Sequence, residues 1–309
     1  MPHRTQMQLI RRRLVGKDGA ERVRELRGIL SELPNYKNGP FADIRKWVLA
    51  EIDATRSRAR IVHRDSIAVR REGAAQIALV GPPNAGKSSL LHALSDVQIK
   101  IGNYAFTTLR PVPALVRIDG VLVQFVEIPG LLEGANDDRG GGRAYLGVLR
   151  EADAIIYCQD ATDATTGLQA VMAEVDRANI TRPALVAATK MDEPDPAAIE
   201  RLAKDFQGLQ VVPTSVLDDA SLTRLKREAW QLTGLIRVYV RHNQIDQTSE
   251  PFALPSGATA LDVAEAIHSD LARTFKAARV WGPSARFAGQ RVGREHVVQD
   301  GDTVEIVSG

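Results

Sequence analysis

The chain has 309 residues, of which 44% are hydrophobic and 25% are charged, and its formal net charge is +2. This composition is typical of a soluble globular protein with two or three domains. It excludes a membrane-spanning protein, because no apolar run approaches the roughly 20 residues of a transmembrane helix. The basic N-terminus lacks the apolar core of a signal sequence. The single cysteine, Cys158, lies in an apolar run, so we expect a buried, unreactive thiol and a reducing, cytoplasmic location.

The charge is unevenly distributed along the chain. Residues 1–74 contain 17 Lys and Arg against 9 Asp and Glu, a balance of +8, whereas the remaining residues have a balance of −6. A basic segment on a near-neutral body indicates a polyanionic partner, with RNA or the ribosome as the first candidate. The alternative is a solvated helix face with no partner, and the charge alone does not decide between the two.

Two helices are predicted in the basic segment. The stretch "ERVRELRGILSEL" (21–33) has apolar residues at helical spacing. It is ended by Pro34 and by the Asn38-Gly39-Pro40 cluster. A second helix follows in "FADIRKWVLAEIDATRSRARIV" (41–62), and its last part is rich in arginine.

From about residue 75 the pattern changes to strands that alternate with helices. Four short apolar runs predict strands buried on both faces, namely "AQIALVG", "VLVQFVEI", "AIIYCQD" and "ALVAATK". Helical stretches such as "TGLQAVMAEVDRAN" lie between several of them. This order predicts an α/β domain with a mostly parallel sheet between helices.

The sequence pattern changes again near residue 236. The run "IRVYVRH" alternates like a strand, "TALDVAEAIHSDLARTF" predicts an amphipathic helix, and "TVEIVSG" predicts a final strand. We therefore expect a basic helical region at 1–73, an α/β domain at 74–235 and a small mixed module at 236–309.

The run "ALVGPPNAGKSSLL" contains the pattern G-x-x-x-x-G-K-[ST] between a strand and a helix, which predicts a phosphate-binding loop. Glycines let backbone N–H groups close around the phosphates, Lys87 reaches the terminal phosphates, and Ser88 ligates Mg²⁺. The N-terminus of the following helix adds partial positive charge. The predicted nucleotide contacts here are Gly81, Pro82, Pro83, Asn84, Ala85, Gly86, Lys87, Ser88 and Ser89.

Two later loops predict that the base is guanine. Thr189-Lys190-Met191-Asp192 is close to the guanine-reading pattern N-K-x-D, with Thr189 where Asn is commoner. The Asp192 carboxylate can accept two hydrogen bonds from guanine, which adenine does not offer, and this argues against an ATPase. The stem of Lys190 can lie along the purine, and Ser215 and Val216 offer a backbone contact to the guanine oxygen.

Two further elements lie between these loops. In "NYAFTTLRPVPA" we favour Thr108 over Thr107 as the residue that closes over Mg²⁺ and the γ-phosphate. The stretch "FVEIPGLLEG" supplies an E-x-x-G loop with Glu127 and Gly130, and Glu127 would hold Mg²⁺ through a water. The five elements occur in the order expected of a GTPase that binds GTP and GDP.

The sequence resembles the Obg/DRG branch of translation-factor-related GTPases, on "GPPNAGKSSLL", "YAFTTLRPVP", "EIPGLLEGA" and "TKMD". The closest resemblance is to the DRG (developmentally regulated GTP-binding protein) group. The C-terminal run "ARVWGPSARFAGQRVGREHVVQDGDTVEIVSG" resembles a TGS domain, a ubiquitin-like β-grasp module. The resemblance implies a P-loop GTPase fold, GTP hydrolysis with Mg²⁺, cytoplasmic residence and association with ribosomes or RNA.

The chain departs from the family pattern in several places. Glu127 replaces Asp, Thr189 replaces Asn, and Val216 stands where Ala is usual. Only 58 residues separate Gly130 from Thr189, which leaves no room for the subdomain that eukaryotic DRG proteins insert there.

Catalysis is expected to involve Lys87, Asn84, Thr108 and Gly130. The residue after Gly130 is Leu131, where many GTPases have the Gln that orients water. In related proteins an Asn at the position of Asn84 helps to hold K⁺, whose charge stabilises the transition state. The resemblance therefore implies K⁺-stimulated hydrolysis, while the alternative role of Asn84 is turn formation.

Three interpretations of Glu127 stay open. It is a working Mg²⁺ ligand that gives slow turnover or weaker Mg²⁺ binding, or a small strand shift compensates for the longer side chain, or the switch is lost. We expect a slow GTPase switch acting on ribosomes or RNA, and a partner protein that stimulates it is an open question. The alternative is a nucleotide-gated adaptor that binds GTP with little hydrolysis.

Overall fold

A computed structural model of the chain describes residues 7, 10, 13–14, 17, 19–34, 40–64, 69–95, 110–129, 135–137, 142–193, 195–241 and 250–308. For residues 19, 20, 40 and 54–64 only the backbone is described. The chain divides into two compact units, Met1–Ser66 and Ile67–Gly309. No helix in the described ranges is both long and apolar enough to cross a membrane. The domain boundaries expected at 73/74 and 235/236 stay predictions.

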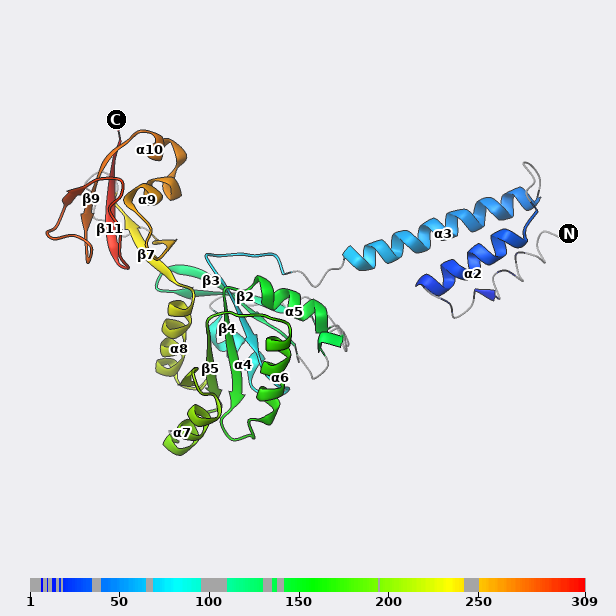
Figure 1. Cartoon of the computed structure of the whole chain (residues 1–309), viewed down its shortest axis with the longest axis horizontal. Coiled ribbons are helices and arrows are strands. Elements are labelled where there is room, and N and C mark those ends of the chain that lie inside the picture. The colour runs from blue at the N-terminus through cyan, green and yellow to red at the C-terminus, as the bar shows by residue number, and fades with distance from the viewer. Residues whose placement is uncertain are drawn as a thin grey trace. The chain divides into compact units, whose positions relative to one another are not determined.

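The first unit is built on two helices, α2 (Gly19–Glu32) and α3 (Pro40–Arg64), which agree with the two helices predicted from the sequence (Figure 1). Each helix contributes apolar residues at spacings of three and four, so that one face of each is buried. This small core consists of Ile10, Leu14, Leu26, Ile29, Leu33, Ile44, Val48 and Ile52.

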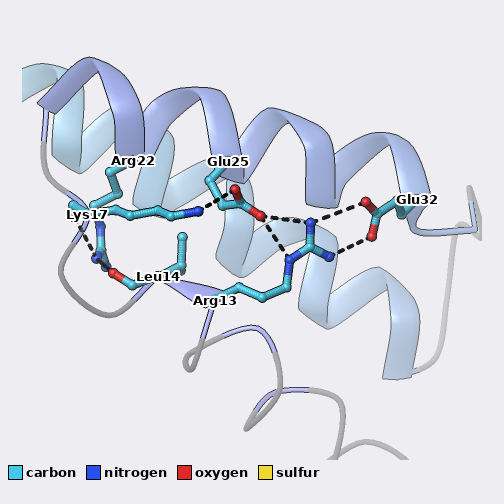
Figure 2. Close-up of polar contacts among 6 residues, drawn as sticks. All are labelled: Arg13, Leu14, Lys17, Arg22, Glu25 and Glu32. Atoms are coloured by element: carbon cyan, nitrogen blue, oxygen red, sulfur yellow. Dashed lines mark hydrogen bonds and ion pairs between the residues drawn. The ribbon is translucent and has the colours of Figure 1, made fainter.

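Much of the basic charge near α2 is paired within this unit. Figure 2 shows Arg13 between Glu25 and Glu32, with a distance of 2.7 Å from its guanidinium to each carboxylate. Lys17 lies 2.6 Å from Glu25. Hydrogen bonds from Lys17, and then from Arg13, hold the pKa of Glu25 below its usual value. These cations therefore already have carboxylate partners. The +8 balance of residues 1–74 already subtracts those carboxylates, so the excess positive charge that a polyanion would meet lies on other residues.

The second unit contains a six-stranded sheet in the order β2-β3-β1-β4-β5-β6. All neighbouring pairs are parallel except β2 and β3, and β1 and β4 are buried along their whole length. This confirms the predicted mostly parallel sheet. The strands are β1 (Gln76–Val80), β2 (Val112–Ile118), β3 (Val121–Glu127), β4 (Ala154–Asp160), β5 (Ala184–Thr189) and β6 (Gln210–Pro213).

Helices cover both faces of this sheet (Figure 1). Residues of α4 and α8 belong to the core on one face, and residues of α5, α6 and α7 belong to the core on the other. This is the layered α/β arrangement expected from the sequence. The helices are α4 (Lys87–Leu94), α5 (Gly142–Glu151), α6 (Thr166–Arg177), α7 (Pro196–Asp205) and α8 (Asp219–Leu232), with the 3₁₀ turn η1 (Ala135–Asp137) before α5.

The β2–β3 hairpin was not predicted. Its two-residue turn consists of Asp119 and Gly120, which have φ angles of 44° and 93°. Ile118 pairs with Val121 on either side of it. A two-residue turn with both φ angles positive favours Asp-Gly, so this dipeptide between two apolar runs was a usable hairpin signal.

The C-terminal part forms a five-stranded sheet in the order β10-β9-β11-β7-β8. β11 and β7 are parallel, the other pairs are antiparallel, and α9 packs on one face of the sheet, as in the predicted β-grasp module. The strands are β7 (Leu235–Val240), β8 (Phe252–Pro255), β9 (Phe275–Trp281), β10 (Gln290–Val292) and β11 (Asp302–Ser308).

The single helix predicted in this module is in fact two, α9 (Ala260–Ile267) and α10 (Ser269–Arg273). His268 separates them because its backbone is extended, with φ −168° and ψ 138°. Its Nδ1 accepts a hydrogen bond from the backbone N–H of Asp270 and so caps α10. A polar cap that satisfies a free N–H favours a new helix start over a continuous helix.

Candidate nucleotide-binding site

The predicted nucleotide contacts gather at one edge of the six-stranded sheet. The phosphate loop follows β1, Glu127 ends β3, Thr189 ends β5, and Ser215 follows β6. The four strands are parallel, so their carboxyl ends lie at the same edge, where open α/β sheets bind their ligands.

Close packing and backbone conformation explain the glycines of the phosphate loop. A Cβ at Gly81 would lie 2.3 Å from the carbonyl oxygen of Cys158 on β4, so no other residue fits there. Gly86, at the N-cap of α4, has a φ of 78°. Asn84 also has a positive φ, 62°, and its side chain is exposed at the tip of the loop. Asn tolerates this conformation better than most residues, and its exposed amide remains available to a ligand.

Lys87 is buried and points back into its own loop. Its Nζ donates hydrogen bonds to the carbonyl oxygens of Gly81, at 2.9 Å, and Pro82, at 2.8 Å. Burial lowers the pKa of its ammonium group, because removal from water disfavours the charged form. A phosphate brought to this loop would restore a charge partner for Lys87.

The two predicted Mg²⁺ ligands in the described residues are in contact. The hydroxyl of Ser88, in the first turn of α4, donates a 2.6 Å hydrogen bond to Oε1 of Glu127. Its proton is thereby satisfied, which leaves its lone pairs for a metal. The described residues contain no cluster of three or more His, Cys, Asp or Glu. One hydroxyl and one carboxylate, completed by water and phosphates, fit the way Mg²⁺ is held in nucleotide sites.

Thr189 joins the guanine-reading loop to the phosphate loop. Its hydroxyl is buried and lies 2.9 Å from the carbonyl oxygen of Ala85 and 3.1 Å from that of Gln159. The methyl and hydroxyl groups also lie beside Gly86. Thr189 therefore provides a polar connection between the two loops, although it stands where Asn is commoner.

Lys190 has a partner that the sequence reading missed. Its Nζ lies 2.6 Å from Oδ2 of Asp160, the last residue of β4. Burial opposes ionisation of Asp160 most strongly, yet hydrogen bonds from Lys190 and Thr162 together hold its pKa below the usual value. The usable signal was a carboxylate at the carboxyl end of a buried strand, the edge where ligands bind.

Asp192 is exposed, and its position is fixed by the loop after β6. The hydroxyl of Ser215 donates a 2.6 Å hydrogen bond to Oδ1 of Asp192. Ser215 is in turn held by Ser221, whose hydroxyl lies 3.0 Å from the Ser215 backbone N–H. The predicted guanine contacts are thus brought together, while the Val216 side chain is 41% exposed beside them.

Some predicted site residues lie outside the described residues, namely Thr107, Thr108, Gly130 and Leu131. Their roles, and the catalytic roles of Lys87 and Asn84, stay predictions. The thiol of Cys158 is buried, as expected, and burial raises its pKa to about 12. A thiol with such a pKa is unreactive at neutral pH.

Comparison with known proteins matches two families. Residues 76–190 match the family described as 50S ribosome-binding GTPase, and residues 236–308 match the TGS domain. The first match contains the phosphate loop and ends at Lys190 of the guanine-reading loop. The second covers the five-stranded sheet.

Similar proteins occur in archaea and eukaryotes. An uncharacterized GTP-binding protein of Methanocaldococcus jannaschii is 28% identical, over 93% of this chain and 92% of its own length. Its alignment spans 360 positions, more than the 309 residues here, so the relative has residues without a counterpart in this chain. Developmentally-regulated GTP-binding protein 1 of Xenopus laevis is also 28% identical, over 77% of this chain and 84% of its own.

Among solved structures, a GTP-binding protein from Pyrococcus horikoshii OT3 is similar with a TM-score of 0.48 and 19% identity, over 76% of this chain and 100% of that one. The classification rests on the two domain matches and on the named relatives. The chain therefore has a P-loop GTPase domain followed by a TGS domain, and it is similar to the developmentally-regulated GTP-binding proteins.

Proposed function

We propose that this GTPase is a slow, K⁺-stimulated switch that uses Mg²⁺ and acts on ribosomes or RNA in the cytoplasm. The observation that carries the proposal is the pair of contacts that join the loops of the site. Thr189 links the guanine-reading loop to the phosphate loop through Ala85, and Ser88 links that loop to Glu127. A nucleotide held by these loops would affect all three together.

Mg²⁺ would be held by Ser88 directly and by Glu127 through water, with Thr108 as a further ligand. When bound, it supplies charge that stabilises the phosphates during transfer. The role of this chain is to position the phosphates with backbone N–H groups of the phosphate loop and with Lys87. Glu has one methylene more than Asp, yet its carboxylate lies 2.6 Å from the hydroxyl of Ser88. This contact supports the proposal that Glu127 can serve as a Mg²⁺ ligand.

K⁺ stimulation rests on Asn84 and on the family resemblance. Asn84 is exposed in the phosphate loop, which supports a contact of its amide with a bound nucleotide or ion. Phosphate release in K⁺ and Na⁺, compared in wild type and Asn84→Ala, tests this role. We expect K⁺ stimulation in the wild type only. Equal stimulation in the variant would assign Asn84 to turn formation alone.

The ribosome or RNA role is supported by the family description, 50S ribosome-binding GTPase, and by the DRG relatives. Co-sedimentation with ribosomes in GDP and in a non-hydrolysable GTP analogue tests it. We expect more protein in the ribosomal pellet in one nucleotide state than in the other. Absence from the pellet in every state would remove this part of the proposal.

A second candidate function is a nucleotide-gated adaptor with little hydrolysis. It is favoured by Glu127 in place of Asp and by Leu131 in place of the water-orienting Gln. The two functions differ in a single-turnover experiment with GTP and excess protein. The switch predicts conversion of bound GTP to GDP, whereas the adaptor predicts that GTP stays intact while nucleotide-dependent partner binding persists.

A further inference from the structure

The sheet of the TGS domain has one face covered by α9. On the opposite face, Arg237 of β7 lies over Trp230 of α8, whereas no helix of the described residues packs on the part formed by β9, β10 and β11. Val238 of β7, Val304 of β11 and Val280 of β9 are buried in the domain core, to which α9 also contributes. Side chains alternate along a strand, so the neighbours of these valines point to the opposite face. On that open face the described strands place polar, aromatic and charged residues.

Two aromatic residues lie in one row across the open face. Thr303 on β11 pairs with Tyr239 on β7 and with Trp281 on β9, so the two rings flank one small residue. Both are partly exposed. The Arg241 guanidinium lies over the Trp281 ring, 4.9 Å from its centroid. Aromatic and guanidinium planes on an open sheet are the groups on which unpaired RNA bases stack.

A row of arginines lies two residues further along the strands. Glu305 on β11 pairs with Arg279 on β9, and Arg279 pairs with Arg291 on β10. The Arg279 side chain is 56% exposed and lies 3.8 Å from Glu305, at the limit of an ion pair. Arg291 is also exposed. Rows two residues apart are separated by about 7 Å, so phosphates could contact arginine while bases stack on the aromatic row.

The balance of charge differs between the two sides of this domain. The exposed helix side carries Asp262, Glu265 and Asp270 with one arginine, Arg273, whereas the open face carries Arg279 and Arg291 with one carboxylate, Glu305. In the N-terminal unit, by contrast, Arg13 and Lys17 are already bound to carboxylates (Figure 2). The open sheet therefore offers an anion both charge complementarity and flat stacking surfaces.

We propose that the open face of the TGS sheet binds single-stranded RNA, with bases on Tyr239 and on the Arg241 guanidinium that covers Trp281, and phosphates on Arg279 and Arg291. The inference deepens the proposed function and rests on it, since it names the surface that contacts RNA. An anionic protein segment would need the arginine row but would make little use of the aromatic row. RNA uses both.

The test measures binding of the full-length chain to a short fluorescein-labelled single-stranded RNA. One variant, Arg279→Ala/Arg291→Ala, removes the arginine row. A matched control, Arg273→Ala/Arg294→Ala, removes the same charge from exposed residues outside the strands.

A further variant, Tyr239→Leu, tests whether bases stack on the Tyr239 ring. Glu305→Gln removes a carboxylate from the row, so tighter binding by this variant cannot result from misfolding. GTP affinity and thermal midpoint serve as folding checks.

We expect the double variant to bind RNA about tenfold more weakly in roughly 100 mM salt, and its log–log salt slope to fall by about 1.4. Tyr239→Leu should lose about tenfold. The control should change by less than about twofold, and Glu305→Gln should bind a few-fold more tightly.

Other results would overturn the proposal in distinguishable ways. RNA binding that is equal in the double variant and the control would place the RNA contact elsewhere and leave the RNA role intact. Polyglutamate that binds as tightly as RNA, with the same loss in the double variant, would identify an anionic protein segment as the ligand. A wild type that binds ribosomes but no free RNA would refute the RNA face while the ribosome function stands.

Discussion

The hydroxyl of Ser88 and the carboxylate of Glu127 are joined by a 2.6 Å hydrogen bond, which connects the start of α4 to the end of β3. The phosphate loop and the acid loop come from segments about forty residues apart, and this contact brings their predicted metal ligands together. The contact supports the proposal that the longer acid at 127 serves as a Mg²⁺ ligand.

The first prediction concerns the charge and length of residue 127. Glu127→Gln keeps the shape but removes the charge, so we expect the Mg²⁺ concentration for half-maximal hydrolysis to rise about tenfold or more. Glu127→Asp restores the commoner acid and should raise Mg²⁺ affinity or turnover. Mg²⁺ titrations of phosphate release measure both. If Glu127→Asp behaves as wild type, the Glu side chain is not a detuned ligand.

The second prediction concerns the hydroxyl of Thr189. Thr189→Val keeps the shape but leaves the carbonyl oxygen of Ala85 without this partner, which should cost about 1–3 kcal/mol of unfolding free energy and weaken GDP binding. Thr189→Ser keeps the hydroxyl and is the matched control. Urea unfolding and GDP titration measure the effects. If Val and Ser variants bind GDP equally, the hydroxyl does not connect the two loops.

A third prediction follows from the ion pair of Asp160 with Lys190. The pKa of Asp160 is lowered in the folded state, so the pair's contribution is present above the unfolded pKa of about 3.9 and is lost as pH falls through the lower folded pKa. Asp160→Asn should reduce unfolding free energy by about 1–2 kcal/mol at pH 7. Urea unfolding from pH 7 to pH 3 should show this difference shrinking only below about pH 4. A difference that is unchanged at the lowest pH would contradict the assignment.

The fourth prediction tests the contact of the β2–β3 turn with the TGS side of the unit. A Cβ at Gly120 would lie 2.7 Å from Cδ of Pro251, and Gly120 has a φ of 93°. Gly257 has a similar φ of 89°, but open space surrounds its added Cβ. Each change to Ala costs about 1 kcal/mol through backbone strain. Gly120→Ala should cost about 1 kcal/mol more, because the Pro251 ring must also move. Equal losses in urea unfolding would show that the turn does not pack against Pro251.

The sequence predicted most of the helices, strands and loops that have a recognisable residue pattern. The strand, glycine loop and helix around Lys87 follow from local spacing, and the parallel sheet follows from apolar runs. The Asp119-Gly120 turn was readable but was missed. The break at His268 was harder to predict, because it depends on a side-chain cap that competes with a continuous amphipathic pattern.

Contacts between distant segments could not be read from the sequence. The bonds of Ser88 with Glu127, Thr189 with Ala85, and Lys190 with Asp160 join residues at or after the ends of different strands, whose spacing depends on sheet order. Likewise, the excess of arginine near the N-terminus did not show that Arg13 and Lys17 already pair with Glu25. Charge counts locate basic segments but not their partners.

The most direct test is phosphate release from GTP by the purified full-length chain with Mg²⁺, in K⁺ and in Na⁺ side by side. The proposed switch predicts turnover that is present in K⁺ and much weaker in Na⁺, and that needs about tenfold more Mg²⁺ in Glu127→Gln. Tight GTP binding without phosphate release in either salt, under single-turnover conditions, would contradict a hydrolysing switch and favour the nucleotide-gated adaptor.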